Sequence, residues 1–233
     1  MKRILAILLL AGFGLSTHAV AQHQRLDDRL DSAQHVLDSI MATPDHAVPE
    51  GIARHAKCIA VVPGVFKGAF IVGAEYGQGV VTCRTGHGWS GPVFIRLAGG
   101  SFGFQVGGQG TDLVLVATND RGLQDLLHDR FKIGADASAA AGPVGRTAQA
   151  STDISMRAEL LTWSRSRGVF AGIDLSGATV SQNVDDTDDL YGSHHRFEHI
   201  LSGEVPPPAA AEGFLHAVRQ YFGDSEMHDH DHD

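Results

Sequence analysis

From Cys58 onward the sequence alternates short apolar runs with glycine-rich breaks, and this pattern limits the possible folds more than any other feature. Short apolar runs bounded by glycine or polar residues are typical of antiparallel strands. We expect Gly77-Gln78 to form a two-residue hairpin turn. Strands spaced this regularly predict a curved antiparallel sheet or a partly closed barrel. The expected strands are Cys58–Val62, Ala69–Tyr76, Gly79–Arg84, Val93–Leu97, Ser101–Gly107, Leu113–Thr118, Glu159–Ser164, Gly168–Asp174 and Ala178–Gln182.

Helical patterns precede, interrupt and follow these strands. Leu26, Leu30 and Leu37 recur at helical spacing and predict a helix over residues 25–42. This helix carries more aspartates than arginines, so it does not predict a basic membrane-facing surface. The fold class is therefore α+β, with N-terminal helices and a C-terminal helix around the sheet, in one domain over residues 22–222. The other expected helices are 49–57, Arg121–Asp129 after an Asn119-Asp120 cap, Asp186–Tyr191, His195–Leu201 and Ala209–Phe222.

The first residues have the form of a cleavable secretory signal. Met1-Lys2-Arg3 is basic, an apolar run follows from Ile4 to Leu15, and small residues stand at Ala19 and Ala21. The alternative is an uncleaved anchor, but the apolar run is shorter than the about 20 residues that span a bilayer. We expect cleavage near Ala21 and a periplasmic or secreted protein.

The net charge narrows the choice of partners. The whole chain has 18 basic and 27 acidic residues, and cleavage removes Lys2 and Arg3 but no acid, so 16 − 27 leaves a net charge of −11. Nucleic-acid binding depends on neutralising phosphates with basic side chains. The composition therefore argues against a nucleic-acid partner.

The two cysteines, Cys58 and Cys83, both lie in strand-like runs. In an oxidising compartment a lone pair usually forms a disulfide, here one that would join two neighbouring strands. Two free thiols or a metal pair are the alternatives, although cysteines this far apart are a weak metal signal.

A serine motif and a histidine-rich tail are the remaining candidates for chemistry. Gly99-Gly100-Ser101-Phe102-Gly103 matches G-x-S-x-G, but a nucleophile elbow needs a helix after the serine, and a strand is expected here. Residues 223–233 form an acidic tail that we expect to be disordered. In it, His228, His230 and His232 alternate with aspartates and could chelate a divalent metal. The alternative is a solvated tail without function.

A series of glycine-rich motifs resembles the SYLF domain family. The strongest match is Asp136-Ala137-Ser138-Ala139-Ala140-Ala141-Gly142-Pro143-Val144-Gly145-Arg146, and Gly88-Trp89-Ser90-Gly91-Pro92 resembles the family's Trp-Ser-x-Pro turn. Together the matching segments cover about two thirds of the mature chain in the family's order. The others are Ile59–Phe70, Gly73–Val80, Gly100–Gly107 and Arg165–Gly172.

This resemblance implies a non-enzymatic lipid-binding protein without a cofactor, whose partner is a phospholipid or a membrane surface. Eukaryotic members bind phosphoinositides, some with actin as a partner, but neither ligand is expected in a bacterial periplasm. What carries over is affinity for a phosphate-bearing lipid or an acyl chain. Lys67 and Arg146, each in a family-matching segment expected to be a glycine-rich turn, are the candidate phosphate ligands. The alternative is that Lys67 is solvated and Arg146 pairs with a carboxylate.

A second function, from a different class, stays open at this point. The chain could be a structural envelope or stress protein whose histidine and aspartate tail sequesters metal. Deleting residues 224–233 would abolish metal binding under that hypothesis and would leave lipid binding intact under the first.

Overall fold

The computed structural model describes residues 24–144, 158–166, 169–170, 175 and 177–223, and it confirms an α+β fold with a strongly curled sheet. A helix over residues 24–41, here called the N-terminal helix, comes first. The remaining elements are α2 (Glu50–Arg54), β1 (Cys58–Thr85), β2 (Gly88–Trp89), β3 (Val93–Ala117), α3 (Asp120–Leu127), β4 (Arg130–Lys132), β5 (Ala139–Ala141), β6 (Leu160–Ser166), β7 (Val169–Phe170), β8 (Thr179–Gln182), α5 (Val184–Tyr191), α6 (Phe197–Leu201), η2 (Ala209–Ala211) and α7 (Glu212–Phe222).

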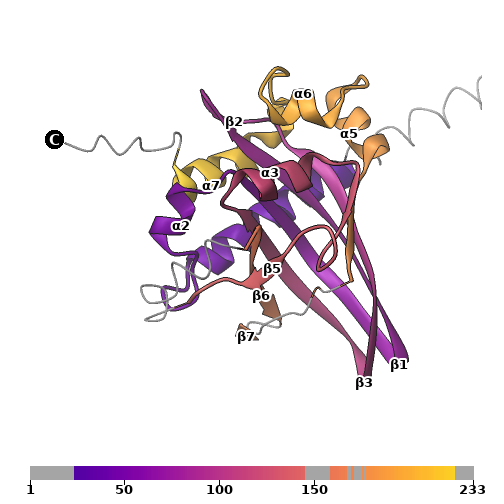
Figure 1. Cartoon of the computed structure of the whole chain (residues 1–233). Helices are drawn as coiled ribbons and strands as arrows, with labels where there is room; N and C mark the ends of the chain where they lie inside the picture. The colour runs from indigo at the N-terminus through magenta and orange to yellow at the C-terminus, as the bar shows by residue number, and fades with distance from the viewer. Residues whose placement is uncertain (1–23, 145–157, 167–168, 171–174, 176, 224–233) are drawn as a thin grey trace, which may run out of the picture.

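Two long strands replace the short ones expected between Cys58 and Thr118. β1 has 28 residues and β3 has 25, and they pair antiparallel from Cys58 opposite Ala117 to Val81 opposite Val93. The hairpin predicted at Gly77-Gln78 is wrong, because both residues continue β1 opposite Leu97 and Arg96. Figure 1 shows the two strands as a ribbon that extends beyond the helices toward the lower right.

Glycines inside β1 lie where the backbone of one half of the strand closely approaches the other half. A Cβ on Gly79 would stand 2.3 Å from the carbonyl oxygen of Val61, and one on Gly77 would stand 2.7 Å from the Val62 side chain. The two halves of the same strand therefore cross in contact. Only residues without a side chain permit that approach, which explains why these glycines interrupt a strand instead of ending it.

The disulfide between Cys58 and Cys83 is confirmed, but it joins the two ends of one curled strand and not two neighbouring strands. Their Cα atoms are 4.0 Å apart. Next to the disulfide, the backbone N–H of Arg84 donates to the carbonyl of Lys57 at 2.7 Å. The disulfide thus closes the curl where the ribbon returns to its start.

Successive residues of the strands point into two different apolar cores. One core, which contains the buried faces of the N-terminal helix, α2 and α7, receives Ile59, Val61, Val80, Phe94, Val114, Val116, Leu161 and Trp163. The other, which contains residues of α3 and α6, receives Cys58, Ala60, Val62, Val81, Val93, Ile95, Leu113, Leu115 and Leu160. Because both faces are covered, the strands are continuous apolar runs and do not alternate with polar residues.

The expected helices are present with shifts of a few residues at their ends. The apolar stripe of the N-terminal helix, including Leu26, Leu30 and Leu37, is buried against the first core. The Asn119 side chain accepts a hydrogen bond from the Gly122 N–H at 2.9 Å and so caps α3 as predicted. The segment over residues 131–141, for which no secondary structure was predicted, contributes β4, β5 and the link between them.

The Trp-Ser segment after β1 has a structural role. The Trp89 indole N–H donates to the Gly223 carbonyl at 2.6 Å and the ring meets Phe222 edge-on. The Ser90 hydroxyl accepts a hydrogen bond from the Cys83 N–H at 3.0 Å. This segment therefore anchors the end of α7 to the disulfide-bonded end of β1.

Candidate functional site

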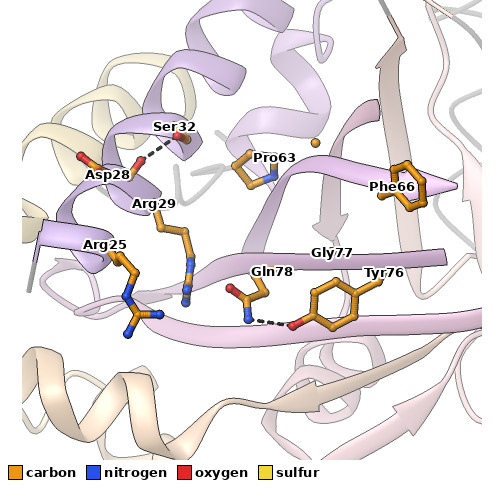
Figure 2. A pocket seen from close by; sticks show the side chains of 10 residues that line it. Arg25, Asp28, Arg29, Ser32, Pro63, Phe66, Tyr76, Gly77 and Gln78 are labelled. Carbon is orange, nitrogen blue, oxygen red and sulfur yellow. Dashed lines mark hydrogen bonds between the residues drawn. The ribbon is translucent and has the colours of Figure 1, made fainter. Parts of the chain in front are cut away.

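A cleft of about 480 Å³ lies between the N-terminal helix and the two halves of β1. Figure 2 shows Arg25 and Arg29 reaching from the helix toward β1, while Phe66 and Tyr76 stand on the strand side. The lining residues are Arg25, Asp28, Arg29, Ser32, Pro63, Gly64, Phe66, Tyr76, Gly77 and Gln78. The cleft thus has two arginines and an aspartate on one wall and aromatic side chains on the other.

The aromatic side chains are exposed because of strand alternation. Val65 and Gly77 point inward, where a Cβ on Gly77 would lie 3.0 Å from the Val65 side chain. Their neighbours Phe66 and Tyr76 therefore point outward on the same side of the curl, with 56% and 48% of their surface exposed. Opposite Phe66 stands Gly110, which offers no side chain to cover the ring.

Arg29 contributes to the cleft but is held by the protein itself. Its guanidinium contacts the Asp186 carboxylate at 2.6 Å, and both side chains are largely buried, at 12% and 13% exposure. The guanidinium also lies over the Phe94 ring, 4.7 Å from its centroid. A buried pair of this kind ties the N-terminal helix to α5 and β3. Arg25, one turn earlier, is exposed and stands at the cleft mouth.

The Asp186 carboxylate is itself part of a buried polar network. The Asn183 side-chain amide donates to it. The Thr187 hydroxyl donates to the Asn183 carbonyl at 2.9 Å and accepts from the Phe94 N–H at 3.0 Å. Asn183 and Thr187 are at most 1% exposed. These bonds hold Asp186 in place and with it the position of Arg29.

Other polar groups of the cleft have partners within it or beside it. The Gln78 side-chain amide donates to the Tyr76 hydroxyl at 2.7 Å, and the Gly64 N–H donates to the Asp112 carboxylate at 3.0 Å. Arg165 lies 3.7 Å from the same carboxylate. The Gly64 amide is therefore occupied, and the charge that the cleft presents at its mouth comes from Arg25 and the nearby Asp28.

The predicted phosphate ligands, Lys67 and Arg146, lie largely outside the described residues. Lys67 follows Phe66 in β1, opposite Gln109, so the glycine-rich turn expected around it is a paired strand. Its side chain and the whole of Arg146 lie outside the described residues, as do His228, His230 and His232. Their proposed roles remain predictions.

Ser101 has the context expected for a strand residue. It lies within β3 and pairs with Gly73 of β1, with strand on both sides. The helix that a nucleophile elbow requires does not follow it. Within the described residues, no group of three or more histidine, cysteine or acidic side chains is arranged to hold a metal ion.

Residues 98–221 match the model of the Ysc84 family, described as Las17-binding protein actin regulator. The chain is also 33% identical over 180 residues to SH3 domain-containing YSC84-like protein 1 of Rattus norvegicus, covering 76% of this chain and 53% of the relative. The chain belongs to the Ysc84 family, whose shared module is the SYLF domain.

Other members of the Ysc84 family are similar to a comparable degree. The Homo sapiens YSC84-like protein 1 is 33% identical over 171 residues, which are 72% of this chain and 50% of the relative. Protein YSC84 of Saccharomyces cerevisiae is 30% identical over 191 residues, 80% of this chain and 41% of the relative. The chain spans about half the length of the curated relatives it matches.

The family names describe binding proteins and not enzymes: the Ysc84 description is of Las17 binding, and another yeast relative is named LAS seventeen-binding protein 3. The described part of this Ysc84-family chain includes no helix long and apolar enough to span a bilayer.

Sequence reasoning missed Arg25, Phe66 and Tyr76 as a group. The prediction for the N-terminal helix used its overall charge, so it did not single out the arginine at the cleft mouth. Phe66 and Tyr76 stand directly next to Val65 and Gly77, and period-two alternation would have placed both aromatic rings outside. That inference required β1 to be one strand, which the turn prediction at Gly77-Gln78 prevented.

Proposed function

We propose that this protein is a non-enzymatic lipid-binding protein that holds a phosphate-bearing lipid at the cleft between the N-terminal helix and β1. The observation that carries the proposal is the meeting of exposed Phe66 and Tyr76 with Arg25 in one cleft. A lipid offers a negative phosphate next to an apolar chain, and this cleft offers a guanidinium next to aromatic rings.

The packing of the sheet favours a surface site over an enclosed one. The core between the strands, α3 and α6 is filled by side chains that are at most 4% exposed. A lipid in that position would have to displace close-packed apolar side chains, whereas the cleft is open to solvent. A bound lipid therefore lies along the cleft, with its phosphate at Arg25.

The site of action in this proposal is the periplasm or the exterior of the cell, after cleavage near Ala21. The basic, apolar and small-residue regions of residues 1–21 support it. The expected result is that protein purified from the periplasmic fraction begins at Gln22. Recovery of the chain from the cytoplasm with Met1 still present would contradict this location. The family description names Las17 binding and actin regulation, and neither is part of this proposal.

Co-flotation with vesicles tests lipid binding. The protein is mixed with vesicles of phosphatidylcholine, with or without phosphatidylglycerol, at low and high salt. We expect flotation with the anionic vesicles that weakens as salt rises, because exposed charge pairs are screened. Since the protein carries a net negative charge, the attraction depends on the local cleft and not on the whole molecule.

Two charge reversals identify the site. Arg25→Glu places a negative charge at the cleft mouth and should weaken vesicle binding about tenfold. Arg196→Glu, a matched reversal of an arginine that is 72% exposed at the start of α6, should leave binding unchanged. Lys67→Ala and Arg146→Ala test the two ligands predicted from sequence. Equal losses for Arg25→Glu and Arg196→Glu would contradict a localised site, and no flotation with either vesicle would remove the proposal.

A further inference from the structure

Exposed aromatic side chains are concentrated on the rim of one cleft. Among the described residues, the exposed large hydrophobics are Phe66, Tyr76 and Val184, and the first two line the cleft beside the N-terminal helix. Single exposed apolar residues are ordinary, but two exposed aromatic side chains on the rim of the same cleft are not required by packing. The exposure of both side chains at one place therefore suggests a binding partner that covers them.

The backbone fixes the two positions from which the aromatic side chains project. Val65 and Gly77 are in contact inside the curl, so Phe66 and Tyr76 cannot separate unless the two halves of β1 part. The Tyr76 hydroxyl is further held by the Gln78 amide at 2.7 Å. Both rings lie on β1, one on each side of the register shift between Ala69 and Ile71. Little backbone entropy is therefore lost when the two side chains are covered.

The chemistry around the rings fits a bilayer surface. Tyrosine and other aromatic rings favour the boundary between headgroups and acyl chains, and arginine beside them meets the phosphates at the same depth. Arg25, Phe66 and Tyr76 line the same open cleft, so a guanidinium and two aromatic rings are presented to solvent together. A soluble acidic protein could pair with Arg25 but would not require two bare aromatic rings.

We infer that Phe66 and Tyr76 insert into the interfacial layer of a phospholipid bilayer while Arg25 contacts a lipid phosphate. This inference rests on the proposed function and adds its mode: the protein docks on a membrane by the aromatic rim of the cleft and does not extract a lipid into its core. The N-terminal helix then contributes a charged side chain at the surface while its apolar stripe stays in the protein core.

Tryptophan placed at the two rim positions reports insertion. Phe66→Trp and Tyr76→Trp are each mixed with vesicles containing phosphatidylglycerol and phosphatidylcholine whose acyl chains are brominated near the headgroup. The native Trp89 and Trp163 are 8% and 3% exposed, so wild-type emission serves as the background. Arg196→Trp places the same reporter on an exposed position of α6 as the matched control.

Insertion predicts a shift to shorter wavelength and quenching by the bromines for tryptophan at 66 and 76, and neither change for tryptophan at 196. Phe66→Ala and Tyr76→Ala should each weaken vesicle binding about tenfold, because each removes the free energy gained when an aromatic ring moves from water into the bilayer interface. Flotation without quenching at 66 and 76 would overturn the insertion and leave the proposed function standing. Absence of flotation would overturn both.

A second copy of the chain is the other occupant that the experiment can detect. If the wild-type protein dimerises without lipid and tryptophan at position 66 is already blue-shifted in that dimer, the rings are covered by protein and the inference is wrong. Sedimentation of the wild type and of Phe66→Ala distinguishes this case, because a dimer through the rim would dissociate in the variant.

Discussion

The Arg84 guanidinium lies over the indole of Trp89, with 4.5 Å between the Arg84 Cζ and the ring centroid. From this position it donates to the carbonyls of Phe222 at 2.7 Å and Gly223 at 3.1 Å, at the end of α7, and to that of Ala56 at 3.0 Å, just after α2. A single cation thus satisfies carbonyls at two helix ends, where the helix dipole favours positive charge.

Loss of the Arg84 guanidinium should therefore destabilise the fold strongly. Arg84→Met keeps the aliphatic stem but leaves several carbonyls without a donor, and we expect a loss of at least about 2 kcal/mol in the free energy of unfolding. Arg84→Lys should be intermediate, because an ammonium group cannot reach all of these carbonyls at once. Urea unfolding followed by tryptophan fluorescence measures both.

Arg54→Met supplies the matched control for Arg84. Arg54 lies in α2 and pairs with Glu50 on the surface, where its side chain is 45% exposed. Its loss should cost no more than about 0.5 kcal/mol. If both variants lose the same stability, the bonds from Arg84 to the helix ends do not carry the effect.

The Cys58–Cys83 disulfide should stabilise the fold mainly by restricting the unfolded chain. The two residues are separated by 25 positions, which corresponds to about 3 kcal/mol in the chain-entropy model. We expect the double variant Cys58→Ala/Cys83→Ala to lose stability of that order in urea. A reducing agent should bring the wild type to the same value and leave the double variant unaffected. A further loss in the double variant on reduction would contradict this explanation.

The sequence predicted the parts of the fold that depend on local pattern. The apolar stripe with Leu26, Leu30 and Leu37 predicted the N-terminal helix, and Asn119 predicted the start of α3 correctly. The family resemblance, carried by glycine-rich segments, was confirmed by the match to residues 98–221. These features depend on neighbours within a few turns of chain, so they are visible without a structure.

The long strands and the cleft could not be predicted because they depend on distant contacts. A glycine in the sequence is compatible with a turn and with a close backbone crossing. Only the close approach of Gly79 to Val61 in the structure shows that this glycine lies at a crossing. Arg29 and Asp186 are 157 positions apart, so no local sequence pattern predicts that they pair. Without that pair, Arg25 and Arg29 are indistinguishable in the sequence, although Arg29 is largely buried and Arg25 is exposed at the cleft mouth.

Gly79→Ala tests the crossing of β1 over itself. The added Cβ would stand 2.3 Å from the Val61 carbonyl oxygen, a backbone atom that cannot move without displacing the strand. We expect a loss of about 2 kcal/mol or more, as for other overpacked core positions. Gly51→Ala is the control, since its Cβ would meet open space within α2 and alanine favours a helix by about 0.5–1 kcal/mol. A neutral result for Gly79→Ala would mean that the two halves of β1 are not in close contact at Gly79 and Val61.

The contacts between Glu159 and Ser138 should make the stability of the fold depend on pH in the acidic range. Its carboxylate accepts a hydrogen bond from the Ser138 backbone N–H, and the Glu159 N–H donates in return to the Ser138 hydroxyl at 3.1 Å. The pKa of Glu159 is lowered below its ordinary value of 4.5. The main cause is the hydrogen bond from the Ser138 backbone, followed by the hydrogen bond with the Ser138 side chain and the positive charge of Arg121. These contacts fasten the start of β6 to the residue before β5.

A lowered pKa in the folded state means that folding favours the ionised carboxylate. Its contribution to stability is therefore fully present above the ordinary pKa of 4.5 and is lost as the pH falls through the lower folded value. Glu159→Gln should reduce the free energy of unfolding by no more than about 0.5 kcal/mol at neutral pH, because solvent screens this exposed contact, and the difference from wild type should shrink as the pH falls below that ordinary pKa. Urea unfolding of both proteins across this pH range measures the difference. Asp45→Asn, at an exposed loop carboxylate, controls for the general effect of removing one negative charge. A difference that stays constant with pH would mean that the ionised form of Glu159 has no special role.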